Sequence, residues 1–503
     1  MSLFRRKSLD ILLAEGGDEE HGLKKALTAV DLTALGIGAI IGAGIFATLG
    51  SATSGASGAP AGPGVALSIL MTAIACGFCA LCYAEFASLV PIAGSAYTYS
   101  YATMGEIVAW IIGWDLVLEY AVGNIAVAIS WAAYFRQLCL GLGYHIPAWM
   151  ATDYRSAVLA AKAVAESGVD SLGPELAVAY EAWQSHPTLG GVPVVFNLLA
   201  ASITGLITWL LVIGVKESAR FNNVVVVLKI ATLLFFVAVG TFYVTPANWT
   251  PFFPGGFNGV WHGASLIFFA YIGFDAISTA AEECKDAGRD MPRGIIASLL
   301  ICTVLYVAAA LTLTGMIPFN QLVGVADPLA AALAYVKQTW AAGVLAFGAV
   351  VAMTAVLLVF QLGQARIFMV MSRDGLLSPW FAKVHPRYRT PHVATILTGA
   401  FVAFFSALAN IDEIVQLTNI GTLFAFVLVC FGILILRARE PERRRKFRVP
   451  LVPFVPLLGA GMCVFLMAGL PLVTWVRFVA WLVVGLALYF LYGRRRSRLA
   501  PRS

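Results

Sequence analysis

GIGAIIGAGIF, residues 36–46, is an apolar stretch in which four of eleven residues are glycine. Each glycine in a helix interior costs up to about 1 kcal/mol relative to alanine, so this stretch is a weak point in a helix. Gly38 and Gly42 also form a GxxxG pair, which lets two membrane helices pack closely. Two interpretations stay open: a close helix contact, or an unwound point whose free backbone N–H groups bind an anion.

A second candidate break lies in FFAYIGFDAISTAAEE, residues 268–283, where Gly273 stands close to Asp275. The two stretches fall in the first and the sixth apolar runs, and glycine-interrupted helices at matching positions of two halves mark transporter binding sites. The N-terminus of a half-helix attracts an anion and the C-terminus of a half-helix attracts a cation. A site that offers both suits a zwitterion such as an amino acid. We expect Asp275 to cap the second half of the sixth helix.

The composition places both stretches in a membrane. Of the 503 residues, 60% are hydrophobic and 12% are charged, which is about half the charged share of a soluble protein. This excludes a secreted enzyme, a nucleic-acid-binding protein and a disordered scaffold, so we expect no nucleic-acid partner. The apolar runs predict an all-α integral membrane protein with twelve transmembrane helices embedded in the lipid bilayer. The predicted spans are 31–49, 63–88, 107–142, 192–215, 221–244, 260–281, 294–317, 341–371, 391–408, 414–436, 449–472 and 475–492.

The basic residues predict the orientation of these spans. An even number of spans puts both termini on one side, and 27 Lys and Arg residues lie in the termini and the loops on that side. The loops on the opposite side hold 4. By the positive-inside rule, we expect both termini in the cytoplasm. We predict a multi-pass protein of the cell (inner or plasma) membrane.

The five-span spacing of the two breaks predicts two inverted five-helix repeats, followed by two further helices. The predicted parts are a cytoplasmic N-terminal tail (1–30), the first repeat (31–244), the second repeat (245–438), helices 11 and 12 (439–493) and a cytoplasmic C-terminal tail (494–503).

The longest predicted extracytoplasmic loop covers residues 143–190 and is mostly hydrophilic. Residues 157–165 and 174–183 are typical of short helices. The loop is either a lid over the site or a surface elaboration, and the second interpretation is favoured because surface loops tolerate insertions.

The eight cysteines lie almost entirely in apolar runs, so we expect no disulfide framework. Cys76, Cys79 and Cys82 line one helix face. We interpret them as small residues at a helix contact rather than as a metal site, because the sequence shows no second cysteine or histidine cluster. We expect no metal and no cofactor.

Several motifs resemble the amino acid–polyamine–organocation superfamily over about Leu27 to Tyr492. GIGAIIGAGIF is similar to its first-helix motif, and residues 268–283 with RDMPRGI (289–295) are similar to its sixth helix and following loop. CYAEFASLVPIAGSAYTYSYATMGE, at 82–106, resembles its signature between helices 2 and 3. Three more motifs resemble the cationic amino acid transporter branch, in particular its bacterial twelve-helix members: SRDGLL (372–377), LTNIGTLFAF (417–426) and FRVPLVPFVPLLG (447–459).

This resemblance implies the leucine-transporter-type fold, with helices 1 and 6 unwound at mid-membrane, and an amino-acid permease that works by alternating access. It implies that the substrate carboxylate binds the backbone N–H groups of Ala43 and Gly44, where Gly42 permits a close approach. The carbonyls that would bind the substrate ammonium are those of Ile40, Phe269, Ala270 and Ile272.

Two ionisable residues inside the predicted spans are candidates for proton coupling. Burial of Glu119 favours its protonated form, so it is either a proton acceptor or a structural hydrogen-bonding group. Lys229 stands in the middle of the fifth span, where an unpaired ammonium costs about 2.5–3.5 kcal/mol. In folds of this type helix 5 passes helices 1 and 8, where sodium-dependent relatives hold sodium. A lysine there would bind carbonyls near Gly42 and exclude sodium. We therefore predict sodium-independent proton symport, with a permanently charged Lys229 and uncoupled exchange as the alternative.

The resemblance also places a pocket-facing side chain on helix 8 at Phe360, and Tyr306 on helix 7 within reach of the pocket. A phenylalanine fills the volume that an arginine or lysine side chain needs, so we predict small neutral L-amino acids such as alanine as substrates. The alternatives are a cationic amino acid (arginine or lysine) uniporter or exchanger and, remotely, a membrane-embedded enzyme. The six histidines are scattered without metal-binding spacing and no phosphate-binding G-x-x-x-x-G-K-[ST] occurs, so we expect no enzyme. A small membrane subunit and specific lipid or sterol contacts stay open.

Overall fold

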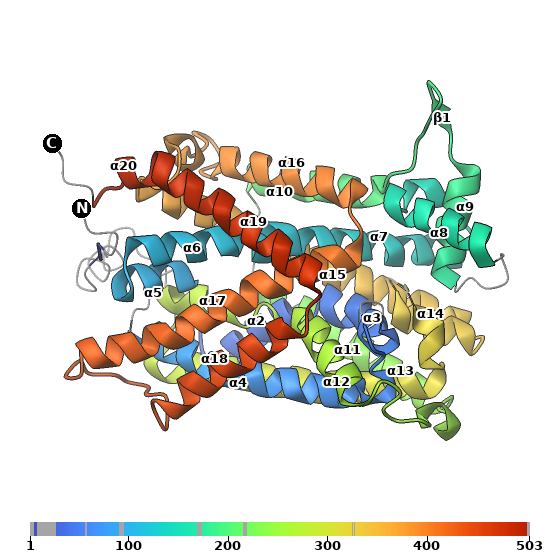
Figure 1. The fold of residues 1–503 in the computed structure, drawn as a ribbon, viewed down its shortest axis with the longest axis horizontal. Coiled ribbons are helices and arrows are strands. Elements are labelled where there is room, and N and C mark those ends of the chain that lie inside the picture. Colours follow the sequence, from blue (N-terminus) through green and yellow to red (C-terminus); the bar gives the residue numbers. More distant parts are fainter. Residues whose placement is uncertain are drawn as a thin grey trace.

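A computed structural model describes residues 5–7, 27–55, 58–89, 95–167, 174–214, 219–323, 325 and 327–499. Most of the predicted N-terminal tail and the last four residues of the C-terminal tail lie outside this part. The described chain is dominated by helices (Figure 1), and its named strands are one short antiparallel hairpin. In that hairpin β1 (Thr188–Leu189) pairs with β2 (Val192–Pro193).

Each of the twelve predicted spans corresponds to an apolar helix in the described chain. Nine helical segments are long and apolar enough to cross a membrane, whereas α10, α16 and α18 are shorter than the about 20 residues that a spanning helix needs. The twelve-span count therefore stays a prediction. The helices are α2 (Ala29–Ile40), α3 (Leu49–Ser54), α4 (Val65–Leu89), α5 (Ser95–Thr103), α6 (Glu106–Val117), α7 (Gly123–Gly141), α8 (Tyr154–Ser167), α9 (Pro174–Ser185), α10 (Leu198–Ile213), α11 (Ala219–Thr241), α12 (Gly256–Ile267), α13 (Ala287–Met316), α14 (Pro328–Tyr335), α15 (Thr339–Arg373), α16 (His392–Leu408), α17 (Ile411–Arg439), α18 (Phe454–Ala468), α19 (Leu472–Leu488) and α20 (Arg494–Arg496).

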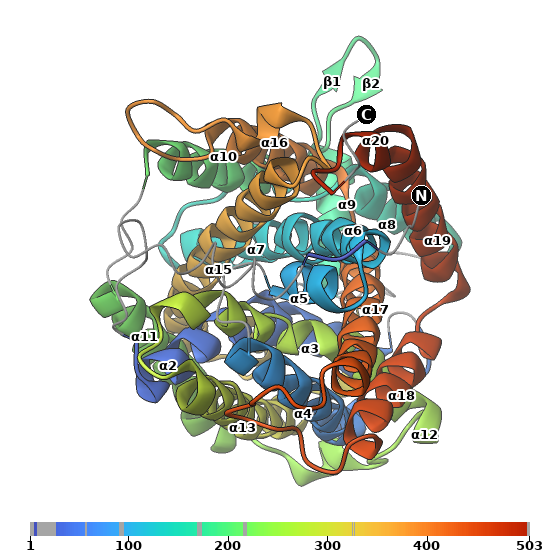
Figure 2. The same ribbon diagram turned by 90° about the vertical axis from the view of Figure 1, so that its left-hand side faces the viewer.

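Three of the most extensive helix contacts join spans that are five apart. The second-span helix α4 packs on α13, the third-span helix α7 on α15, and α10 on α16. The broken first and sixth spans also contact each other. In the end-on view of Figure 2, α10 and α16 form one edge of the molecule and α19 lies at another, with α17 further inside.

The described parts of the two terminal segments lie at one end of the molecule. The Glu106 N–H donates to the Arg5 carbonyl at 2.8 Å, and the Ser497 hydroxyl donates to the Glu106 carboxylate at 2.5 Å. Figure 1 shows α20 at this end, whereas α8 and α9 lie at the opposite end. This arrangement agrees with an even number of crossings.

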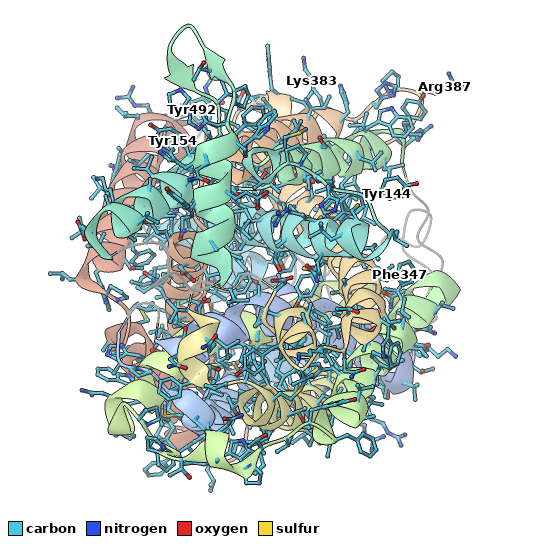
Figure 3. All side chains as sticks on the ribbon, turned by 90° about the vertical axis from the view of Figure 1, so that its right-hand side faces the viewer. Tyr144, Tyr154, Phe347, Lys383, Arg387 and Tyr492 are labelled. Carbon is cyan, nitrogen blue, oxygen red and sulfur yellow. The ribbon has the colours of Figure 1, made fainter. Side chains whose placement is uncertain are left out.

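The long loop forms the two predicted helices, α8 and α9, which are confirmed with slightly wider bounds. They enclose a small apolar cluster of their own that includes Ala157 and Ala182. Figure 3 views the molecule from the end that carries them and labels Tyr154, whose ring packs edge-on against Trp183 at 6.2 Å between centroids.

The cysteine row on α4 lies at a helix contact, as its spacing predicts. The Cys79 sulfur lies 3.4 Å from that of Cys463 on α18 and 3.8 Å from that of Cys430 on α17, and all eight cysteines are free thiols. Two neighbouring helices thus each bring one cysteine to the row, a contact that the spacing of the row does not reveal.

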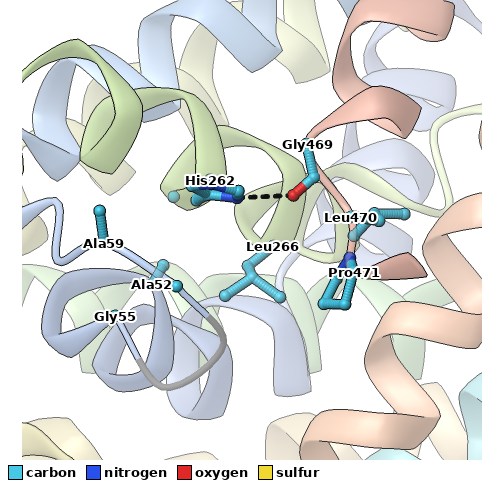
Figure 4. Close-up of a pocket in the computed structure, with 10 residues that line it drawn as sticks. Ala52, Gly55, Ala59, His262, Leu266, Gly469, Leu470 and Pro471 are labelled. Carbon is cyan, nitrogen blue, oxygen red and sulfur yellow. Dashed lines mark hydrogen bonds between the residues drawn. The ribbon is translucent and has the colours of Figure 1, made fainter. Parts of the chain in front are cut away.

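The first half of the sixth span is fixed to the link between α18 and α19. The His262 ring N–H donates to the Gly469 carbonyl at 2.7 Å (Figure 4). The cavity beside this bond, lined by Leu266 and Pro471 among others, has a volume of only about 10 Å³. A space of that size holds at most one water molecule, so it is not a substrate site.

Candidate functional site

The first span is interrupted within the quoted glycine-rich stretch. Helix α2 ends at Ile40, Ile41 has an extended backbone (φ −74°, ψ 102°), and a π-helical turn starts again at Gly44. The first N–H groups of a helical segment have no partner within it, so this turn offers donors next to Ala43. The Tyr134 hydroxyl donates to the Phe46 carbonyl at 2.7 Å and fixes the turn from α7.

The sixth span is interrupted around Gly273. Helix α12 continues as a 3₁₀ turn to Tyr271, Gly273 has a φ of 114°, and a second 3₁₀ segment runs over Asp275–Glu283. This φ favours glycine, and a Cβ at position 273 would also lie 2.8 Å from the Ala39 carbonyl oxygen. Asp275 is the first residue of the second segment and not its cap, because Phe274 takes the N-cap position and makes no side-chain cap bond. The expected capping role was therefore wrong.

The two breaks lie directly against each other. A Cβ on Gly44 would approach the Ala270 Cα to 2.2 Å, so any side chain at this position collides with backbone. The Tyr306 hydroxyl lies 3.0 Å from the Ile40 carbonyl oxygen and 3.1 Å from that of Ala270. It donates to these two groups across the junction. Close helix contact and an interrupted helix thus occur together in this stretch.

The other predicted site residues lie around the same junction. Phe269, Ile272 and Ala43 are buried beside it. Gly42 faces α15, where a Cβ would meet a Val356 methyl carbon at 2.8 Å. Sequence reasoning missed Val356. The sequence of α15 is apolar on all sides, so it does not show which face of the helix packs against Gly42.

Lys229 on α11 is buried, with 1% of its surface exposed, and reaches the first span. Its ammonium donates to the Gly38 carbonyl at 2.5 Å, about one turn before Gly42. The lysine therefore contacts the last full turn of α2. A positive charge at the C-terminal end of a helix is stabilised by the helix dipole and by the carbonyls there.

Glu119 lies in a π-helical turn of the third span, next to the sixth break. Its carboxyl group, the Asp275 carboxyl group and Thr422 of α17 lie together, and Asp275 also approaches the N–H groups of Gly273 and Ala276. Both acids are buried. No partner within hydrogen-bonding distance is found for the oxygens of either carboxyl group among the described residues. Repulsion between two neighbouring buried carboxylates favours one proton on the pair. Sequence reasoning did not bring these acids together, since they are far apart in the chain.

Phe360 is buried, with 3% of its surface exposed. Its ring meets that of Tyr120 edge-on at 5.6 Å between centroids, and a Cβ on Gly123 would lie 3.4 Å from it. Phe360 thus packs against the third span, one turn of α15 after Val356. Contact with substrate at this position stays a prediction.

An aromatic cluster surrounds the sixth break and was also missed by sequence reasoning. Phe426 of α17 packs against Phe268 at 5.7 Å and against Phe274 at 5.1 Å, one on each side of the break. Tyr83 of α4 contacts both Phe274 and Phe426. The Asn419 amide donates to the Ser265 carbonyl at 2.8 Å. Neighbouring helices therefore hold this break in place.

A cavity of about 490 Å³ lies at the end of the molecule that carries α8 and α9. Its polar lining includes Arg136, Asp153, Asp327 and Asp412. Burial raises the pKa of Asp327, in the connection before α14, to about 7, and the Arg136 guanidinium partly opposes this. The long loop thus covers a cavity, which is compatible with the lid interpretation.

Comparison with known proteins adds a family match to this geometry. The model of the amino acid permease family matches residues 27–489. The chain is 46% identical to the branched-chain amino acid permease BcaP of Bacillus subtilis and 45% identical to the methylthioribose transporter of the same organism, over 99% of both chains in each case. It is 35% identical to the vacuolar cationic amino acid transporter 4 of Arabidopsis thaliana, over 88% of this chain and 68% of that protein.

Proposed function

This chain belongs to the amino acid permease family, and from that premise we propose that it is a secondary active transporter of neutral L-amino acids. The observation that carries the proposal is the contact between the two helix breaks, where Tyr306 joins the carbonyls of Ile40 and Ala270. The n-to-n+5 helix contacts support two inverted repeats, residues 31–244 and 245–438. In that architecture the site lies at the repeat interface and opens to each side in turn.

The proposed site recognises both charged ends of an amino acid through the backbone. The N–H groups of Ala43 and Gly44 bind the carboxylate, and Gly42 allows its approach. The carbonyls of Ile40, Phe269, Ala270 and Ile272 bind the ammonium. Because an ammonium has three donors, it replaces the single Tyr306 hydroxyl at Ile40 and Ala270 when substrate binds.

The proposed coupling ion is the proton, and transport is independent of sodium. Lys229 supports this proposal because its ammonium already donates a hydrogen bond to a carbonyl of the first span, that of Gly38. A cation at this place excludes a second one by charge and by volume. Loss and return of its proton would release and re-form the bond to α2. In this proposal the neighbouring Glu119 and Asp275 carboxyl groups share a second exchangeable proton beside the sixth break.

The proposed substrates are small neutral amino acids, because a phenylalanine at the predicted pocket position 360, packed on Tyr120, would leave little room for a long side chain. The Bacillus subtilis relative named as a branched-chain amino acid permease favours extending this class to valine, leucine and isoleucine. Cationic substrates are the alternative, suggested by the plant relatives. The methylthioribose transporter favours an uncharged thioether sugar as a second candidate. That molecule has neither a carboxylate nor an ammonium and leaves the backbone groups of the proposed site without charged partners.

Counterflow in proteoliposomes tests this proposal. Liposomes with the purified protein are loaded in turn with alanine, leucine, arginine or methylthioribose, and entry of the same labelled compound is followed. We expect counterflow with alanine and leucine and little with arginine. Counterflow with methylthioribose alone would replace the proposal with the sugar. Counterflow with arginine alone would replace it with the cationic alternative.

A further inference from the structure

A groove on the outer side of α13 lies beside the connection between α17 and α18. It has a volume of about 770 Å³. From α13 it is lined by Arg289, Arg293 and Ile296, and from the connection by Lys446 and Phe447. The groove is unrelated to the helix breaks and lies at the end of α13 that the basic residues predict to be cytoplasmic.

A glycine at position 288 leaves room for the Lys446 side chain at the base of the groove. A Cβ on Gly288 would lie 2.2 Å from the Lys446 Cδ, so the lysine stem lies across this glycine. The Lys446 ammonium then pairs with the Asp286 carboxylate at 3.1 Å. This bond lowers the pKa of Asp286 below its usual range. Lys446 is thereby held at one edge of the groove.

The charges in the groove are unbalanced. Arg289 and Arg293 are exposed and stand one helical turn apart. Among the residues that the structure describes, neither forms an ion pair with a carboxylate. Two guanidinium groups at this spacing present parallel donors that suit a phosphate group.

The same face of α13 becomes apolar further into the predicted membrane. Leu300 lines the groove and has 63% of its surface exposed, and Val304 has 69% exposed. With a rise of 1.5 Å per residue, Leu300 lies about 16 Å beyond Arg289 along the helix. That separation matches the distance from a lipid headgroup to the middle of its acyl chain in one leaflet.

We propose that this groove binds an anionic glycerophospholipid. The phosphate lies between Arg289 and Arg293, and one acyl chain follows Ile296, Leu300 and Val304. A soluble phosphate ester would use the two arginines but would gain nothing from the apolar face. Basic residues at a membrane surface attract anionic lipids, and here a groove adds a defined place for one molecule.

Native mass spectrometry of the purified protein tests the proposal. The protein is incubated with equal amounts of phosphatidylglycerol and phosphatidylethanolamine, and the bound lipids are counted. We expect a preference for phosphatidylglycerol that falls at least about tenfold in the Arg289→Gln/Arg293→Gln variant. The Arg387→Gln/Arg495→Gln variant loses the same charge from exposed positions elsewhere and should keep the preference.

A variant that keeps both charges and a soluble phosphate competitor serve as controls. The Arg289→Lys/Arg293→Lys variant retains both charges and should retain most of the preference, which separates lipid binding from a folding defect. Glycerol 3-phosphate in excess should displace little lipid. An equal preference in the Gln variant and the unmodified protein, or full displacement by glycerol 3-phosphate, would overturn the proposal.

Discussion

The break in the first span is built from backbone and small residues, whereas aromatic rings and carboxyl groups surround the break in the sixth. Gly42 and Gly44 have no room for a Cβ, and the only charged group bonded to the end of α2 among the described residues is Lys229. The sixth break lies between Phe268 and Phe274 and next to Glu119 and Asp275. In our account the first break supplies the carboxylate site and responds to a cation. The sixth break supplies carbonyls for the substrate ammonium, and protonation of Glu119 or Asp275 changes the charge beside it.

The largest effect is expected at Gly44. In the Gly44→Ala variant the new methyl group meets the Ala270 backbone at 2.2 Å, and overpacking of this kind costs about 1–3 kcal/mol. We expect counterflow of alanine to fall about 10- to 100-fold. Gly77→Ala is the matched control, because its Cβ has nothing within 4 Å. Equal losses in both variants would remove the special role of the first break.

The second prediction concerns Lys229 and separates coupling from binding. Lys229→Met keeps the apolar stem but has no ammonium for the Gly38 carbonyl. We expect it to retain counterflow and to lose accumulation of substrate under an inward proton gradient. Lys383→Met, in the connection between α15 and α16, should accumulate substrate like the unmodified protein. Accumulation by Lys229→Met equal to that of the unmodified protein would end the coupling role.

The third prediction tests the acid pair at the sixth break. Glu119→Gln keeps a hydrogen-bonding group beside Asp275 but cannot exchange a proton. We expect proton-driven accumulation to fall about two- to fivefold while counterflow stays, because Lys229 still couples. Glu166→Gln, on the exposed face of α8, is the control. A loss of counterflow with no change in its pH dependence would favour the structural interpretation of Glu119.

A smaller effect is expected at Tyr306. Tyr306→Phe leaves the Ile40 and Ala270 carbonyls without their donor until a substrate ammonium arrives. One hydrogen bond contributes about 0.5–1.5 kcal/mol, so we expect substrate to bind about two- to tenfold more tightly. The substrate-free protein should also unfold at a lower temperature. Weaker substrate binding would show that the hydroxyl supports the bound substrate, and would contradict its displacement by the ammonium.

The smallest expected change is one of selectivity. Phe360→Ser removes the ring that packs on Tyr120 and should admit larger amino acids, with a severalfold gain in their counterflow relative to alanine. Competition by arginine and phenylalanine against labelled alanine measures this gain. Tight arginine binding by the unmodified protein would contradict the assigned substrate class.

The positions of the helices and of both breaks were predictable because glycine and long apolar runs act locally. GIGAIIGAGIF interrupts the first helix at Ile41, and Gly273 takes the left-handed backbone that a glycine allows. Both features depend on residues within one turn of the chain.

Contacts between distant helices were not predictable from spacing. Val356 faces Gly42, and Glu119 meets Asp275, because of the rotation of helices whose sequences are apolar on all sides. Such a helix has no periodic signal that identifies its packed face. For the same reason the sequence did not predict that Cys430 and Cys463 lie next to Cys79. The positions of the helices along the chain are therefore readable from the sequence, and the partners of each side chain are not.

The central claim is that backbone groups at the two breaks bind both ends of an amino acid. A scintillation proximity assay with labelled leucine and labelled alanine tests it directly, with unlabelled competitors that lack one charge. The account predicts that the amino acids compete, whereas their amides, without the carboxylate, and the matching fatty acids, without the ammonium, do not. Competition by either analogue as strong as that of its parent amino acid would contradict it.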